Sequence, residues 1–190
     1  MTTPAHAVVN LLVLGRPKTP KRQGVIIAGA IIPDIPMFLF YFFEKVVQGS
    51  PEWTIWTHTY FEQRWQTFFD LFNSLPLIGL GLLVTVSLKY KGWSLLLFSM
   101  ALHAGCDLLL HHDDAHRHFF LLSDWRFRSP VSYWDPNHFG GIVAPLEGMV
   151  VMVGCIILFR SASSTLLKYS AGTLGAIYVA TFLYAWTVWF

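Results

Sequence analysis

The sequence predicts an all-α, polytopic membrane protein, and its composition and apolar runs are the observations that predict it. Hydrophobic residues make up 54% of the 190 residues and charged residues only 13%, unlike an ordinary soluble domain. Several apolar runs are long enough for a helix to span a bilayer, where the backbone must satisfy its own hydrogen bonds. Eight Trp, seven Tyr and sixteen Phe residues suit the aromatic belts of membrane proteins. We expect residues 1–190 to form a single helical bundle domain.

About five transmembrane helices are expected, near residues 23–43, 70–88, 93–111, 140–159 and 166–189. A shorter helix is expected over residues 4–14. It is too short to cross a bilayer, so it is either re-entrant or interfacial. Its apolar run does not have the order of a cleavable signal peptide, because the basic residues follow it rather than precede it. We therefore expect this segment to be retained.

Two long connections separate the predicted spans. Residues 44–69 are rich in aromatic side chains and are predicted to form an amphipathic helix at the membrane interface. Residues 112–139 are polar and aromatic, and their prolines disfavour a continuous helix. The two cysteines, Cys106 and Cys155, lie in different spans at depths that differ by about 13 Å, so no disulfide is expected between them.

The charges divide between the two kinds of connection. The short connections carry eight basic residues and no acid, whereas the two long loops carry eight acids and five bases. By the positive-inside rule, the short connections face the cytoplasm and the long aromatic loops face outward. The sequence thus predicts an integral protein of a bacterial-type inner membrane or its equivalent. The basic residues are too few and too dispersed for nucleic-acid binding, and membrane lipids are the expected partners.

The segment LHAGCDLLLHHDDAHRH, residues 102–118, is the most informative part of the chain. It holds five of the eight histidines and three of the eleven acids, and its first half lies inside an apolar run. A charged side chain at a bilayer centre costs about 2.5–3.5 kcal/mol on insertion scales. Such groups are usually retained for a metal, for protons or for a polar substrate. The alternative is a buried hydrogen-bonded network that only holds helices together.

A metal site is the first interpretation of this pattern. His103 and Asp107 stand one helical turn apart, so an imidazole and a carboxylate can reach the same divalent ion. Counted at 1.5 Å per residue from the basic ends of their segments, His6 lies at about 15 Å and Asp34 at about 18 Å, close to the depths of about 18 Å for His103 and about 24 Å for Asp107. Asp34 also lies between two prolines, which bend a span and free backbone carbonyls beside a cavity. We expect His6, Asp34, His103 and Asp107 to hold a metal.

Other polar residues are secondary candidates. His111, Asp114 and His116 stand at or beyond the outer end of the predicted 93–111 helix and could act as general acid and base. Two or three members of this cluster, which also includes His112, Asp113 and His118, are expected to be structural. Asp70 could simply cap a helix, and Glu147 could face the cavity or pair with a base. Three arginines could steer a phosphate group: Arg117, Arg126 and Arg128.

The order of these motifs resembles a bacterial family of small membrane-bound, metal-dependent hydrolases, which is similar in metal-ligand order to zinc-dependent phospholipase C. The matching residues are His6 in PAHAVVN, Asp34 in IPDIP, and His103 with Asp107 in LHAGCD. The resemblance consists of short motifs scattered between about residues 4 and 118. The family pattern has a His-Ser pair where this chain has Asn73-Ser74. Since asparagine is a poor zinc ligand, either one metal is lost or the HHDDAHRH cluster replaces that contact.

The preferred hypothesis is a metal-dependent hydrolase that acts on a lipid or lipid-linked ester, with a phosphoester as the expected bond. Zinc is the expected metal, with manganese or iron as alternatives, and it would activate a bound water. The substrate class follows from the resemblance and from the depth of the site. Two alternatives stay open at this point. One is a non-enzymatic membrane subunit or assembly factor. The other is a di-iron oxygenase, although the chain lacks the HxxHH box of such enzymes.

Overall fold

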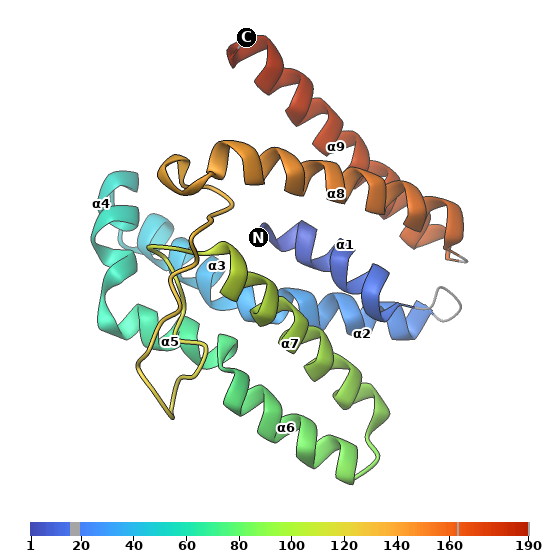
Figure 1. Cartoon of the computed structure of the whole chain (residues 1–190), viewed down its shortest axis with the longest axis horizontal. Helices are drawn as coiled ribbons and strands as arrows, with labels where there is room; N and C mark the ends of the chain where they lie inside the picture. Colours follow the sequence, from blue (N-terminus) through green and yellow to red (C-terminus); the bar gives the residue numbers. More distant parts are fainter. Residues whose placement is uncertain (16–19, 163, 190) are drawn as a thin grey trace.

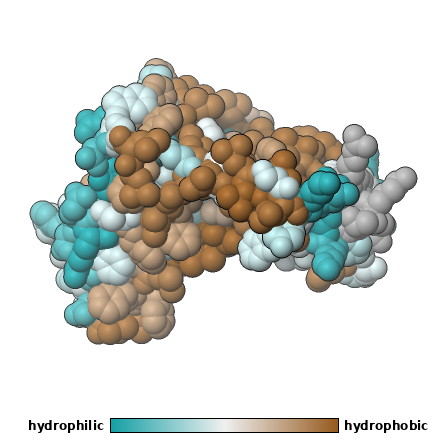
Figure 2. All heavy atoms as spheres, turned by 90° about the horizontal axis from the view of Figure 1, so that it is seen from below, coloured by the Kyte–Doolittle hydropathy of each residue, from teal (hydrophilic) through white to brown (hydrophobic). Residues whose placement is uncertain are grey.

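The computed structural model describes residues 1–15, 20–162 and 164–189, and the regular structure of these residues is helical, without strands. Five helical stretches are long and apolar enough to cross a membrane: Pro20–Val47, Gln63–Ser87, Lys91–Leu110, Gly140–Ser161 and Thr165–Tyr184. The predicted all-α fold with five spans is therefore confirmed, and the chain has the helices of an integral membrane protein. Hydrophilic residues gather at the two ends of the molecule, with an apolar band between them (Figure 2). The orientation of these ends in a membrane stays a prediction.

The short N-terminal helix packs inside the bundle. Helix α1, Thr3–Leu14, lies among α2 (Pro20–Ile31), α7 (Lys91–Leu110) and α8 (Gly140–Ser161) (Figure 1). Its buried residues include Ala5, Val8 and Leu11, which belong to the largest apolar core. This packing matches the re-entrant alternative and not a helix that lies on the membrane surface. It also carries His6 into the interior.

The α-helix of the first span is interrupted at its prolines. After α2 the chain makes a 3₁₀ turn, Ile32–Asp34, and continues as α3, Ile35–Phe42, which ends in a π-helical turn at Phe43–Val47. Pro33 and Pro36 supply no backbone N–H, so the α-helical hydrogen-bond ladder is interrupted between them. Asp34 lies at this interruption.

The prediction that residues 44–69 form one helix was wrong, and their place at the membrane interface stays a prediction. This segment folds as α4 (Glu52–Thr57), a 3₁₀ turn at Thr59–Phe61, and the first part of α5 (Gln63–Asn73). Its aromatic residues pack on one another and on α3, in a core of Phe40, Ile55, Tyr60 and Phe69. Trp53 and Phe61 stay exposed, at 67% and 50%, so this core covers only part of the aromatic set.

The second span begins at Gln63 and not near residue 70 as predicted. Its two helices, α5 and α6 (Leu75–Ser87), meet at Ser74, whose hydroxyl accepts a hydrogen bond of 3.4 Å from the Leu77 backbone N–H. Ser74 is thus the residue that caps a helix here. Asp70 lies within α5, and the prediction that it stands at a helix start was wrong.

Helix α7 is held to α1 and α2 by a polar contact in the apolar core. The Asn10 side-chain amide donates to both the carbonyl and the hydroxyl oxygen of Ser99, at 2.8 Å each. The Ser99 hydroxyl donates in turn to the Ile26 carbonyl at 2.6 Å. Gly29 lets these helices approach, since a Cβ atom there would lie 2.4 Å from the Leu96 carbonyl oxygen. The contact fixes the axial position of α7 relative to its neighbours.

The predicted second loop is largely irregular, with a short 3₁₀ helix at Pro136–His138, and leads into α8. Helix α9, Thr165–Trp189, packs against α8 and points away from the other helices (Figure 1). Cys106 and Cys155 are both free thiols, as predicted. The loop crosses the end of the bundle at which α1 begins and α7 ends (Figure 1).

Candidate functional site

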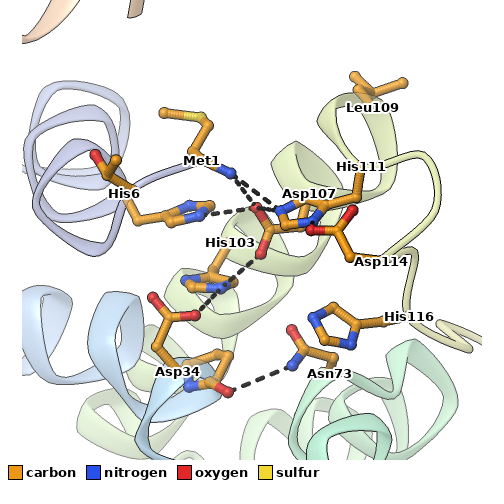
Figure 3. Close-up of polar contacts among 12 residues, drawn as sticks. Met1, His6, Asp34, Asn73, His103, Asp107, Leu109, His111, Asp114 and His116 are labelled. Carbon is orange, nitrogen blue, oxygen red and sulfur yellow. Dashed lines mark hydrogen bonds and ion pairs between the residues drawn. The ribbon is translucent and has the colours of Figure 1, made fainter. Parts of the chain in front are cut away.

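Two helices that are distant in sequence bring three donor side chains together at this end of the bundle. His6 comes from α1, and His103 and Asp107 come from α7. Their side chains are almost completely buried, and one ligand atom from each lies within 4.8 Å of the others. Figure 3 shows the three side chains facing one another.

The two histidines share one carboxylate. Their rings stack with centroids 3.6 Å apart and an interplanar angle of 16°. His6 Nε2 lies 2.9 Å from Asp107 Oδ1, and His103 Nε2 lies 3.0 Å from Asp107 Oδ2. The i, i+4 spacing of His103 and Asp107 thus places both side chains on the same face of α7, and α1 supplies the second ring.

The tautomer of His103 is fixed by the backbone of α2. His103 Nδ1 lies 2.7 Å from the Ala30 carbonyl oxygen, so Nδ1 must carry the proton that it donates. In the neutral ring, Nε2 then has a lone pair, yet it faces Asp107 and also Asp34 Oδ1 at 3.5 Å. Acceptors facing one another in a buried site require a cation or a second proton between them. A histidine held by a carbonyl at Nδ1 is also the usual form of a metal ligand.

Asp34 lies between the buried cluster and a cavity. Its side chain is 18% exposed, and its Oδ2 accepts a hydrogen bond of 2.5 Å from the Thr3 hydroxyl. Asp34 ends the 3₁₀ turn at the two prolines, and its Oδ1 lies 3.5 Å from His103 Nε2. The four residues expected to hold a metal are therefore neighbours, although Asp34 is outside the tight group of three donors.

His111 links the buried cluster to the long loop. Its Nε2 lies 3.2 Å from Asp107 Oδ1, and its Nδ1 lies 2.8 Å from Asp114 Oδ2. Asp114 also accepts a hydrogen bond of 2.9 Å from the Trp134 indole. Burial favours the neutral ring, but the carboxylates of Asp107 and Asp114 raise the pKa of His111 to about 9. The Met1 amino group also joins this series of polar contacts, since it lies 2.7 Å from Asp107 Oδ1.

A cavity of about 860 Å³ opens beside these residues. Its polar side is formed by Asp34, Asp107, His111, Asp114 and His116. The opposite side is apolar and aromatic, and includes Ile31, Met37, Phe38, Trp56, Tyr60 and Phe61. The cavity therefore combines a buried, charged end with walls that suit a hydrocarbon chain.

Two further histidines lie near this cavity without joining the three-donor group. His116 lines the cavity, and its Nδ1 lies 3.6 Å from Asp70 Oδ1. His118 is almost fully buried, and its Nδ1 lies 3.1 Å from the His116 carbonyl oxygen. Burial lowers the pKa of His118 to about 4, so this ring is neutral near pH 7.

The remaining secondary candidates have other contacts. Asn73 donates to the carbonyls of Pro33 and Phe69, so it braces the kink of the first span. His112 contacts the Ser129 carbonyl and stacks on His138 in the long loop. Glu147 accepts from the backbone N–H and the hydroxyl of Thr2.

The three arginines do not line the cavity. Arg117 forms ion pairs with Asp70 and Asp124, and Arg126 donates to Gln66 and to the Ala115 carbonyl. Arg128 is exposed. Their positions give no support to a role in binding a substrate phosphate.

Three contacts of the site were not anticipated from the sequence. Trp134 lies twenty residues beyond Asp114, and no spacing rule connects them. The contact with the Ala30 carbonyl involves a backbone atom, so no residue type in the sequence indicates it. The contribution of Thr3 could have been predicted, because Thr3 precedes His6 by three residues and so lies on the same face of α1.

Comparisons with protein-family models, with curated proteins and with solved structures return no match. The resemblance to membrane-bound hydrolases rests on short sequence motifs alone and stays a prediction. The function has to be argued from the site.

Proposed function

We propose that this protein is a metal-dependent membrane hydrolase that cleaves an ester or phosphoester bond of a lipid or lipid-linked substrate. The observation that carries the proposal is the buried group of His6, His103 and Asp107, with ligand atoms within 4.8 Å of one another beside a large cavity.

The donor set fits a catalytic zinc site. Two imidazoles and one carboxylate are the protein ligands of many hydrolytic zinc enzymes, in which a further position stays open for water. The Ala30 carbonyl orients the His103 ring through Nδ1, and Nε2 faces the Asp107 carboxylate, an arrangement that suits a cation between them. When bound, the metal would lower the pKa of water toward about 7 and polarise the scissile bond.

The surrounding residues would orient the substrate and move protons. His111 presents Nε2 toward the ligand group, while Asp114 holds its Nδ1 at 2.8 Å. A histidine oriented by a carboxylate in this way is suited to general acid–base catalysis. Trp134 fixes Asp114 from the opposite side. His116, on the cavity wall, is a second group able to accept or donate a proton near a leaving group.

The apolar wall suggests the substrate class. Met37, Phe38 and Phe61 line the cavity, and the side chains of Phe38 and Phe61 are about half exposed, at 55% and 50%. A hydrocarbon chain can lie against these residues while its polar ester reaches Asp34 and His111. Burial of such a chain contributes about 0.8 kcal/mol per methylene group.

A non-enzymatic role is the second candidate, and one observation favours it. The contacts of Asp107, with His6 on one side and His103 and His111 on the other, also join α1 to α7. The same network would therefore serve to hold two helices together in a membrane subunit.

Elemental analysis of the detergent-purified full chain distinguishes the two. The wild type is compared with His103→Ala/Asp107→Ala and with a control, His58→Ala/Asp113→Ala, which removes the same residue types at exposed positions. Near-stoichiometric zinc or manganese that is lost only in the first variant supports the hydrolase. Iron in place of zinc, with activity that depends on a reductant, would favour the oxygenase. A metal-free wild type, purified without chelator, contradicts both enzyme hypotheses.

Activity is then measured on vesicles that contain a fluorogenic phosphoester or carboxyl-ester lipid. Asp107→Asn keeps the size of the side chain and removes its charge, so it should abolish turnover together with the metal. Metal without any turnover on either lipid class would contradict the proposed substrate.

A further inference from the structure

A second large cavity lies away from the candidate site, at the end of the bundle where α6 joins α7. Its volume is about 770 Å³, and it is an open cavity between the first turns of α2 and α7 and the end of α6. None of the residues that line it also lines the candidate site. Whatever it binds is therefore independent of the proposed hydrolase.

Positive charge dominates the rim of this cavity. Lys21 and Arg22 come from α2, Lys89 comes from the turn after α6, and Lys91 begins α7. No acidic residue is among the residues that line it. Within the described part of the chain, the ion pairs of lysine and arginine involve Lys45, Arg64, Arg117 and Arg126. The four cations of the rim are thus uncompensated, in a cavity that can hold an anion.

The N-termini of two helices add partial positive charge to this rim. Helices α2 and α7 both begin at the cavity, since Lys21 and Arg22 lie in the first turn of α2 and Lys91 and Gly92 in that of α7. The N-terminus of a helix carries a partial positive charge and unpaired backbone N–H groups. Two such ends beside four cationic side chains favour a phosphate over a neutral ligand.

The walls of the cavity are apolar. Val25, Val86, Leu95 and Phe98 line it below the basic rim. Val86 and Phe98 are also about half exposed on the outside of the bundle, at 54% and 50%. The apolar wall is therefore accessible from outside the bundle. Trp93, exposed next to Gly92, is a residue typical of the membrane interface.

We propose that this cavity binds an anionic phospholipid. The phosphate headgroup would lie among Lys21, Arg22, Lys89 and Lys91, and an acyl chain would lie along Val86 and Phe98. Basic pockets between transmembrane helices are known to bind lipid headgroups by this combination of charge and apolar contact. A soluble phosphate would use the rim but not the apolar wall.

The test is a titration of the detergent-purified full chain with dioleoyl phosphatidylglycerol or with dioleoyl phosphatidylcholine, with bound lipid counted by native mass spectrometry. Lys89→Gln/Lys91→Gln is compared with a control, Arg160→Gln/Lys168→Gln, which loses two exposed cations from α8 and α9. A second variant, Lys21→Gln/Arg22→Gln, changes the opposite side of the same rim.

We expect one tightly bound phosphatidylglycerol in the wild type and weaker binding of phosphatidylcholine. Each rim variant should weaken phosphatidylglycerol binding about tenfold or more, and the control should change it less than about threefold. Equal binding of the two lipids, or equal losses in the rim and control variants, would overturn the proposal. Displacement of the lipid by millimolar inorganic phosphate would overturn the assignment to a lipid and favour a soluble anion. Circular dichroism of every variant confirms that the chain is folded.

Discussion

Asp70 and Arg117 form a two-point ion pair that attaches the long loop to the second span. The Arg117 backbone N–H donates to Asp70 Oδ1 at 2.9 Å, and its guanidinium Nε donates to Asp70 Oδ2 at 2.5 Å. Asp70 is fully buried and the Arg117 side chain is 7% exposed. Because the same loop carries His111 and Asp114, the pair determines where these groups lie above the cavity.

We predict that Asp70→Asn destabilises the protein strongly, by about 3–5 kcal/mol, since it leaves the buried Arg117 charge with the exposed Asp124 as its remaining charged partner. The measurement is the free energy of unfolding in mixed detergent micelles. The matched control is Glu62→Gln, which breaks the exposed Glu62–Arg64 pair and should cost at most about 1 kcal/mol. Similar losses for the two variants would show that the buried pair does not hold the loop.

Close packing of α2 against α7 gives a second prediction. A Cβ atom at Gly29 would lie 2.4 Å from the Leu96 carbonyl oxygen, which cannot move without shifting the helix. Gly29→Ala should therefore destabilise the fold by about 1–3 kcal/mol, measured by the same unfolding experiment. Gly79 in α6 has no atom within 4 Å of the corresponding position, so Gly79→Ala should be neutral or stabilising by less than about 1 kcal/mol. The prediction fails if the two substitutions have equal effects.

Some of this architecture could be predicted because it depends on periodicity alone. The spacing of His103 and Asp107 places them on one helix face, and counting residues from the basic ends puts His6 and Asp34 at a similar depth. The structure brings these four residues together, as neighbours on three helical segments. Helix rise and turn are constant, so such estimates hold even when loops are uncertain.

Contacts that depend on loop conformation could not be predicted in this way. The pattern around Asp70 is the same for a helix cap and for a buried ion pair, and only the position of Arg117 decides between them. Likewise, the aromatic residues between Trp53 and Phe69 would suit a membrane surface, but they also suit contacts with Phe40, which the fold provides. The sequence alone does not show which of these possible contacts the folded chain makes.

The buried state of His118 predicts a pH dependence of stability. Burial lowers the pKa of His118 to about 4 in the fold, below its ordinary value of 6.5. The unfolded chain then binds a proton more readily than the folded one, so stability is complete above pH 6.5 and falls as the pH drops from 6.5 toward 4. The charged groups that also act on this ring, His116, Asp107 and His111, stay unchanged in the variants that test it.

The measurement is the unfolding midpoint of wild type and His118→Leu between pH 7.5 and about pH 4.5. The variant cannot be protonated at this position, so its midpoint should fall less steeply in that range than that of the wild type. His58→Leu, at an exposed position, should leave the slope of the wild type unchanged. Parallel slopes for wild type and His118→Leu would contradict the neutral buried ring.

His111 lies between Asp107 and Asp114, and substitutions can show whether it transfers protons or binds the metal. If the proposed hydrolase is correct, His111→Gln should lower kcat by about 10²–10⁴-fold, because it removes a general acid–base group. Metal content should be retained, since the three-donor group of His6, His103 and Asp107 is intact. Trp134→Phe should lower kcat by less, because it removes one of the two hydrogen bonds that orient Asp114 and leaves the imidazole in place.

Both variants are assayed for metal and for turnover in the same vesicles, with His58→Gln as the control. A larger effect of Trp134→Phe than of His111→Gln would contradict the proton-transfer role, since the positioning residue cannot matter more than the group it positions. Loss of metal in His111→Gln alone would instead make His111 a ligand. The buried group would then extend from α1 and α7 to the start of the long loop, and the Asp70–Arg117 pair would become part of what holds the metal.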